Sequence, residues 1–303
     1  MRPTIAAERD GWPIVTVVDR TDEEPWKRSL LTSPLITALR DHDARVVCVH
    51  NSPGRARLMA CRSCRNLLAC ERCAASVQQL DDASLHCRRC GTERPPVCQH
   101  CGSSALANVR PGVSRLREEL EAAANRPVAA ITGESDEALP DVDVFVGTEA
   151  VLHRVRDANV VVFMDIDAEL LAPRYRAAEQ AFALLVRAAR VLGPRRDGGR
   201  LLLQTFSPHH EVIEAALHAD PGRLAKAEAA RRRDLSLPPF GALALVSGAG
   251  SADFVTATGL AAAADGDGFL LRADDWHVLG DALAAAPRPK GARLRIEVDP
   301  ARR

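Results

Sequence analysis

Eight of the nine cysteines in this 303-residue chain form four Cys-x-x-Cys pairs between positions 61 and 101. The pairs are Cys61/Cys64, Cys70/Cys73, Cys87/Cys90 and Cys98/Cys101, separated by five, thirteen and seven residues. Each pair forms a short turn that directs two sulfurs to one point, and two such turns complete the tetrahedral thiolate shell that zinc favours. The spacing predicts two closed zinc sites. Their role is expected to be structural, because no coordination position is left for water.

The alternatives to zinc are four unrelated redox or stray Cys-x-x-Cys pairs and iron–sulfur clusters. Four-thiolate sites also suit iron–sulfur clusters, so this alternative stays open. Residues 1–4 are followed by no apolar stretch of a secretory signal, and runs such as 159–164 are far shorter than the roughly 20 residues of a membrane helix. We therefore expect a cytoplasmic protein without membrane contact, in which cysteines stay reduced and bind metal. Cys48 lies in an apolar run and is expected to be a buried strand residue.

The charge of the chain is balanced overall but not locally. With 40 basic and 40 acidic residues, binding to nucleic acid through bulk charge is not expected. Between positions 55 and 115, however, there are ten arginines and only four acidic residues. The candidate DNA-binding residues are Arg55, Arg57, Arg62, Arg65, Arg88 and Arg89. A solvated face in an arginine-rich chain is the alternative, and the absence of aromatic residues among these arginines gives no support for base stacking.

Apolar runs alternate with helical patterns on both sides of the cysteines. Strands are predicted at 14–19, 45–50, 128–132, 142–146, 160–165 and 200–205. Helices are predicted at 33–41, 113–125 and 175–192. Almost wholly apolar strands that alternate with helices indicate a parallel sheet covered on both faces, so the expected fold class is α/β.

The sequence changes character near residue 237. A strand at 242–247, a helix at 253–264 and a strand at 293–298 predict a small second α/β unit. Residues 284–291 are predicted to form a loop or linker, because they contain glycine and several prolines.

Nucleotide-binding motifs are absent from the sequence. Neither GxxxxGK[ST] nor GxGxxG occurs, so no backbone cradle for phosphates is predicted and independent ATP hydrolysis is not expected. Residues 161–167 mimic a strand that ends in a magnesium-binding acid. We favour the simpler reading of Asp165 and Asp167 as acids at the carboxyl end of a strand. No catalytic residue is assigned.

Several short motifs accompany the cysteines in order. They are Asn51-Ser52-Pro53-Gly54 before Cys61, Asp165-Ile166-Asp167, Arg176-Ala177-Ala178-Glu179, Gln204-Thr205 with Pro208 and His210, and Arg233 with Leu237-Pro238-Pro239. In this order and spacing, from about residue 14 to residue 299, the chain resembles the family of the replication restart protein PriA, also called primosomal protein N′.

The resemblance implies a domain organisation and a set of partners. It implies a RecA-like second helicase lobe at 12–58 and 104–236, an inserted two-zinc module at 59–103 and a shortened C-terminal domain at 237–303. It implies a nested pairing, with Cys61, Cys64, Cys98 and Cys101 on one zinc and Cys70, Cys73, Cys87 and Cys90 on the other. The implied partners are single-stranded or forked DNA, primosome proteins and the machinery that loads the replicative helicase, in a nucleoid-associated protein.

The departures from the family pattern concern the use of ATP. Val191 and Pro194 stand where the family has the two arginines of Gln-x-x-Gly-Arg-x-Gly-Arg, so ATP is not expected to be a cofactor. We find no counterpart of the N-terminal DNA-binding region, the winged helix or the first helicase lobe. We expect a branch without helicase motifs, or the C-terminal portion of a longer gene product.

Three functions follow as hypotheses. The first is fork binding and primosome assembly, which reloads the replicative helicase without helicase activity in this chain. The second is an ATP-dependent 3′-5′ helicase subunit that takes its first lobe from another chain. The third is a zinc-ribbon adaptor with no connection to forks.

Overall fold

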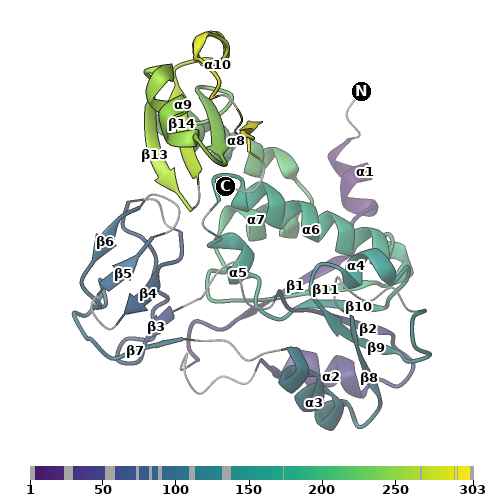
Figure 1. Cartoon of the computed structure of the whole chain (residues 1–303). Coiled ribbons are helices and arrows are strands. Elements are labelled where there is room, and N and C mark those ends of the chain that lie inside the picture. The colour runs from purple at the N-terminus through teal and green to yellow at the C-terminus, as the bar shows by residue number, and fades with distance from the viewer. Residues whose placement is uncertain are drawn as a thin grey trace. The chain divides into compact units, whose positions relative to one another are not determined.

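The computed structural model forms two compact units, Met1–Leu224 and Ala225–Arg303 (Figure 1). The residues that it describes are 4–23, 30–51, 59–72, 75–81, 84–87, 91–108, 113–131, 138–172, 174–266, 268–289, 291 and 293–300. Within these ranges, no helix is long and apolar enough to cross a membrane.

A six-stranded parallel sheet forms the centre of the first unit (Figure 1). Its spatial order is β1 (Ile14–Asp19), β11 (Arg200–Thr205), β10 (Val160–Phe163), β2 (Val46–Val49), β9 (Val144–Gly147) and β8 (Val128–Ile131). Every neighbouring pair is parallel. The predicted α/β fold class with a parallel sheet is therefore confirmed.

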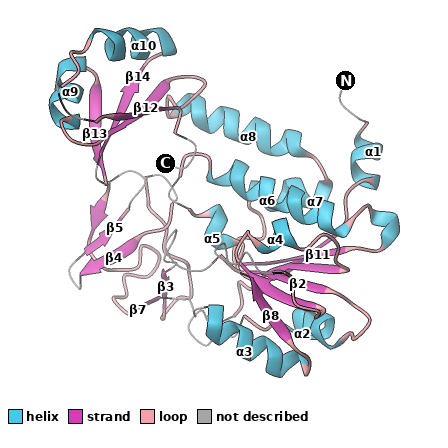
Figure 2. Ribbon diagram, turned by 45° about the vertical axis from the view of Figure 1, so that its right-hand side comes forward, coloured by secondary structure: helices cyan, strands magenta, loops and turns pink. Residues whose placement is uncertain are grey.

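Helices cover both faces of this sheet (Figure 2). Because side chains of a strand alternate between its two faces, Val46 and Cys48 of β2 pack in one core cluster and Val47 and Val49 in another. The first cluster includes residues of α2 (Ser33–Arg40) and α3 (Val113–Ala124). The second includes residues of α4 (Val151–Arg154), α6 (Ala177–Leu192) and α7 (Glu211–His218). Strands buried on both faces explain the continuous apolar runs in the sequence.

The cysteine segment folds from short strands. β3 (Met59–Cys61) pairs antiparallel with β7 (Leu106–Asn108), and β4 (Gln78–Asp81), β5 (Ser84–His86) and β6 (Glu93–Arg94) form a three-stranded sheet. Its core cluster is small and includes Cys61, Cys70, Cys87 and Cys98 themselves. A core this small seldom stabilises a fold by itself. Binding of metal by the cysteines is therefore expected to be necessary for this segment to fold.

The second unit contains an antiparallel sheet in the order β13 (Ala261–Asp265), β14 (Gly268–Ala273), β12 (Ala242–Ser247) and β15 (Arg295–Val298). Helices α9 (Ser251–Thr258) and α10 (Trp276–Ala285) pack against it through Phe254, Val255 and Leu279. The chain enters this unit through α8 (Pro221–Asp234).

Two predictions about the second unit are wrong. The helix predicted over 253–264 ends at Thr258, because Gly259 adopts a left-handed φ of 67° and residues 261–265 pair with β14 instead. Residues 284 and 285, predicted as loop, close α10. The apolar contacts of Leu279 and Ala286 with the sheet hold this helix, and such long-range contacts leave no local signal in an alanine-rich sequence.

Candidate metal centre

Four cysteines from the two ends of the cysteine segment converge on one point. The sulfurs of Cys61, Cys64, Cys98 and Cys101 all lie within 4.8 Å of one another. The Sγ atoms of Cys61 and Cys101 are 3.5 Å apart, and those of Cys64 and Cys98 are 3.4 Å apart. A zinc–sulfur bond of about 2.3 Å in a tetrahedron places neighbouring sulfurs roughly 3.8 Å apart. The donor atoms and their spacing therefore fit a tetrahedral thiolate-bound metal ion.

The first and last Cys-x-x-Cys turns share one backbone geometry. In each turn the N–H of the first cysteine donates to the carbonyl five residues later, Cys61 to Asn66 at 3.0 Å and Cys98 to Ser103 at 2.8 Å. The carbonyl of the first cysteine accepts from the residue after the second cysteine, which is Arg65 or Gly102. Both of these residues have a left-handed φ, 71° and 73°. The turn thus returns the chain sharply and presents both sulfurs on one side.

The other two turns repeat the same bond. Cys70 N–H donates to Ala75 O at 2.7 Å, and Cys87 N–H donates to Thr92 O at 2.9 Å. Gly91 donates to Cys87 O and has a φ of 72°. Cys70 and Cys87 are both buried, whereas Cys73 and Cys90 lie outside the described residues.

The electrostatics of the four-sulfur group favour a cation. Burial raises the pKa of Cys98 to about 12, and hydrogen bonds to Cys64 and Cys61 add to the rise. Burial also acts to raise the pKa of Cys64, but hydrogen bonds from Asn66 and from Cys98 lower it to about 6. Four sulfurs this close cannot all become thiolates by themselves, because their charges repel, and a dication at the centre removes that repulsion.

Cys48 is not part of this group. It lies in the middle of β2, fully buried in the core under α2 and α3. Burial raises its pKa to about 12, which keeps the thiol neutral. This placement agrees with its interpretation as an ordinary buried strand cysteine.

Two of the six candidate DNA-binding arginines fall in the described part of the chain. Arg62 and Arg65 are both exposed; Arg62 lies within the first turn of the metal centre, between Cys61 and Cys64, and Arg65 directly follows Cys64. One guanidinium N–H of Arg65 donates to the carbonyl of Asp22 at 3.2 Å. Four candidates, Arg55, Arg57, Arg88 and Arg89, lie outside the described residues.

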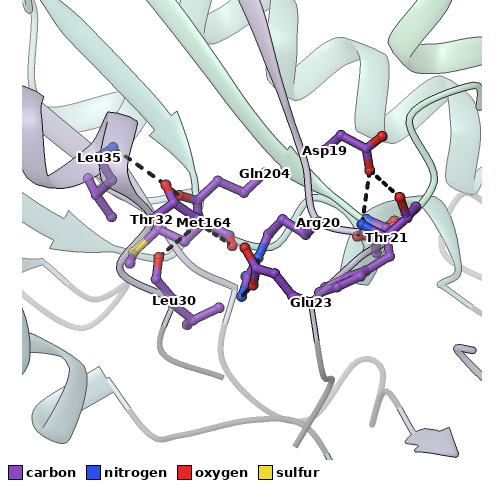
Figure 3. A network of polar contacts seen from close by, with 11 residues as sticks. Asp19, Arg20, Thr21, Glu23, Leu30, Thr32, Leu35, Met164 and Gln204 are labelled. Atoms are coloured by element: carbon purple, nitrogen blue, oxygen red, sulfur yellow. Dashed lines mark hydrogen bonds and ion pairs between the residues drawn. The ribbon is translucent and has the colours of Figure 1, made fainter. Parts of the chain in front are cut away.

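The carboxyl edge of the parallel sheet carries a buried polar network that sequence reasoning missed (Figure 3). The side-chain amide of Gln204 donates to the carbonyls of Leu30 and Met164, both at 2.9 Å, and accepts a hydrogen bond of 2.5 Å from the Thr32 hydroxyl. Gln204 thereby ties β11 to the start of α2, since Thr32 is the N-cap of that helix.

Arg20, directly after β1, is another buried polar residue at this edge, only 1% exposed. Its guanidinium bonds Glu23 at 2.6 Å and lies 5.0 Å from the centre of the Phe206 ring. The sequence signal that could have identified Arg20 is its position as a charged residue directly after a mostly apolar strand.

Asp167 is the first residue of α5 (Asp167–Leu170), four residues after the end of β10, and is fully buried. Its carboxylate accepts hydrogen bonds of 2.8 Å from the Thr205 hydroxyl and from the Phe206 N–H. Burial, and then the charge of Asp165, raise its pKa to about 6. These contacts tie Asp167 to the end of β11.

The segment that departs from the ATP-coupling motif lies at the end of α6. Val191 is buried in the core, and Pro194 precedes a short 3-10 turn, Arg195–Asp197. The nearby arginines Arg190, Arg195 and Arg196 are exposed.

Comparison with known proteins shows which proteins this chain is similar to. No protein-family model matches the chain. Curated proteins named replication restart protein PriA do match: that of Thermotoga maritima is 29% identical over 253 residues, that of Synechocystis sp. 28% over 261 and that of Bacillus subtilis 26% over 262. These matches cover 77%, 77% and 78% of this chain, and 34%, 31% and 32% of the relatives.

The chain thus spans about a third of the length of the curated relatives that it matches. The resemblance expected from the motifs is confirmed. Over about three quarters of its length, this chain is similar to the replication restart protein PriA, in a way consistent with the C-terminal region of that protein.

Proposed function

We propose that this chain is a zinc-stabilised DNA-binding protein of replication restart. It binds stalled or abandoned forks and promotes assembly of the primosome and reloading of the replicative helicase. The observation that carries the proposal is the convergence of Cys61, Cys64, Cys98 and Cys101 in a chain that is similar to replication restart proteins. Zinc is the metal that best suits four thiolates in a closed tetrahedron.

A second zinc site with Cys70, Cys73, Cys87 and Cys90 is part of the proposal. Its support is the repeated backbone bond, from the N–H of the first cysteine to the carbonyl five residues later, in the turns that begin at Cys70 and Cys87. The two turns that begin at Cys61 and Cys98, which share this bond, direct their sulfurs to one point. The expected metal content is therefore about two zinc ions per chain.

The proposed DNA contacts are arginines around the metal centres. Arg62 stands between two zinc ligands, so the metal holds its backbone in place and little ordering entropy is lost on binding phosphate. Binding by such arginines is electrostatic and must weaken as salt rises. Arg55, Arg57, Arg65, Arg88 and Arg89 belong to the same proposed surface.

We propose that the chain has no helicase activity of its own. The support is the replacement of the two ATP-coupling arginines by Val191, whose side chain is in the core, and Pro194. If the chain is instead half of a motor, it must hydrolyse ATP in the presence of DNA, alone or with a chain that supplies the other lobe.

Three measurements on the purified chain test the proposal. Metal analysis is expected to give about two zinc ions. Binding of forked DNA is expected to exceed binding of blunt duplex, and the Arg62→Ala variant is expected to lower the salt slope by about one. Arg156→Ala, at an exposed position away from the cysteines, is the matched control. DNA-stimulated ATP hydrolysis by the chain would contradict the proposal, as would zinc-loaded protein that does not bind DNA.

A further inference from the structure

One short turn at the carboxyl edge of the sheet contacts three separate parts of the first unit. The turn consists of α5 (Asp167–Leu170) and Leu171, closed by the bond from Leu171 N–H to Asp167 O at 2.9 Å. Asp167 bonds the end of β11, as described above. Glu169 bonds the end of β2, and the carbonyl of Leu171 bonds the cysteine segment.

Glu169 is held from two sides. The amide Nδ2 of Asn51 donates to its Oε1 at 2.6 Å, and Arg174 donates to its Oε2 at 2.8 Å. The side chains of Arg174 and Glu169 are 10% and 7% exposed. A buried ion pair with the second carboxylate oxygen also bonded leaves the glutamate little freedom to move.

Asn51 uses both ends of its amide. While Nδ2 bonds Glu169, Oδ1 accepts from the backbone N–H of Glu149, two residues after the end of β9, at 2.8 Å. Asn51 also lies two residues after the end of β2, on the side from which the chain continues to the cysteine segment. A residue with these contacts fixes the position of the chain just beyond the strand.

The cysteine segment reaches the same turn from its other side. The N–H of Ser76, which lies between Cys70 and Cys87, donates to the carbonyl of Leu171 at 2.8 Å. Ser76 is 1% exposed, so this bond is shielded from water.

We propose that Asn51 and Glu169 are positioning residues that seat the cysteine segment on the sheet through the turn Asp167–Leu171. Asn51 and Arg174 hold Glu169, Glu169 holds the turn, and the turn offers its Leu171 carbonyl to Ser76. We call this series of contacts, from Asn51 through Glu169 and Leu171 to Ser76, the seat. Loss of the Asn51–Glu169 bond leaves both metal sites intact and loosens the seat. The seat stands on these contacts alone. An effect of the seat on DNA binding rests on the function proposed above.

Hydrogen exchange of the Ser76 amide in the zinc-loaded full chain tests the seat. Asn51→Ala removes the bond and is expected to speed exchange by about tenfold or more. Asn51→Asp keeps the acceptor for Glu149 N–H but places a second carboxylate against Glu169, so its effect is expected to be larger still. Glu118→Gln, at an exposed position of α3, is the control and is expected to leave exchange unchanged.

A double variant separates positioning from general loosening. Combining Asn51→Asp with Glu169→Gln restores the bond with donor and acceptor exchanged, so exchange at Ser76 is expected to be slower than in Asn51→Asp alone. The visible spectrum of cobalt-substituted protein, which reports the thiolate shell, is expected to be the same in all variants. Unchanged Ser76 exchange in both Asn51 variants, or a cobalt spectrum altered by them, would overturn the seat.

DNA affinity is measured on the same variants. Weaker fork binding by Asn51→Ala, with zinc content unchanged, supports a role of the seat in presenting the arginines. A wild-type chain that does not bind DNA overturns the proposed function, while the exchange result still decides the seat.

Discussion

The sulfur of Cys64 lies 3.4 Å from the sulfur of Cys98, although 34 positions separate the two residues in the sequence. Between them run all three strands of the small sheet β4–β6. A metal ion bound by both turns therefore closes a long loop. Because such a site rarely exists in the unfolded chain, the free energy of metal binding adds to the stability of the folded segment.

Replacement of Cys98 by serine is expected to release zinc from this site. Three remaining thiolates do not close the tetrahedron, so the content is expected to fall by about one ion and the segment to unfold locally, as metal-dependent modules do. Metal analysis and amide exchange over β3 and β7 measure both effects. Cys48→Ala is the control, because Cys48 is in the core of the sheet and is expected to keep the full zinc content. A serine variant with wild-type zinc would remove Cys98 from the ligand set.

Cys48 is expected to resist thiol reagents in the folded chain. Burial raises its pKa to about 12, and only the thiolate is nucleophilic. After treatment of the native protein with iodoacetamide at pH 8, mass spectrometry is expected to find Cys48 unmodified, and modified only after unfolding. Rapid modification in the native state would show that β2 opens on the time scale of the reaction.

Asp167 is expected to make stability fall as the pH rises through the range from about 4 to about 6. Burial raises the pKa of Asp167 from 3.8 to about 6, so the folded state binds this proton more tightly than the unfolded state. The associated stability is fully present below pH 3.8 and is lost as the pH passes 6, by roughly 3 kcal/mol at most.

The variant Asp167→Asn removes this titration. Relative to wild type, its free energy of unfolding is expected to improve between pH 4 and pH 7, as measured by urea denaturation of both chains. Acid also releases zinc, but it does so in both chains, so the difference between them isolates Asp167. A pH-independent difference would place the pKa of Asp167 near its ordinary value.

The ion pair of Glu228 with Arg232 is expected to be important for the second unit. The two side chains are 4% and 9% exposed, and Arg232 also donates to the carbonyl of Pro238 at 3.2 Å. Glu228→Ala leaves a buried guanidinium without its carboxylate, at an expected cost of about 3 kcal/mol. Amide exchange in β12 measures the loss.

Glu297→Ala is the comparison for this prediction. It breaks the pair of Glu297 with Arg295, whose side chain is 80% exposed. Exposed pairs contribute about 0–1 kcal/mol, so a small effect is expected. Equal effects of the two variants would show that Arg232 finds another partner when Glu228 is absent.

Local patterns predicted much of the first unit. The runs at 14–19 and 200–205 coincide with β1 and β11. β11 is buried from Leu201 to Thr205, as expected for a strand covered on both faces, whereas β1 is an edge strand and is only partly buried. Ser33-Pro34, expected as N-cap and first helical residue, marked the start of α2 to within one residue: the N-cap is Thr32, and Pro34 lies in the first turn, where a proline loses no hydrogen bond. The second unit was harder. Alanines at 261–264 carry no strand signal, and only pairing with β14 makes them a strand.

The sequence by itself determined the cysteine turns and the layered parallel sheet, because both follow from residue type at short, regular spacing. Which cysteines share a centre was decided by tertiary structure: the pairing of β3 with β7 brings Cys61 and Cys64 to Cys98 and Cys101. The same holds for the bonds of Asn51 with Glu169 and of Gln204 with Met164. The first bond joins residues 118 positions apart in the sequence, and the second joins residues 40 positions apart. No local sequence pattern records a partner at such a separation.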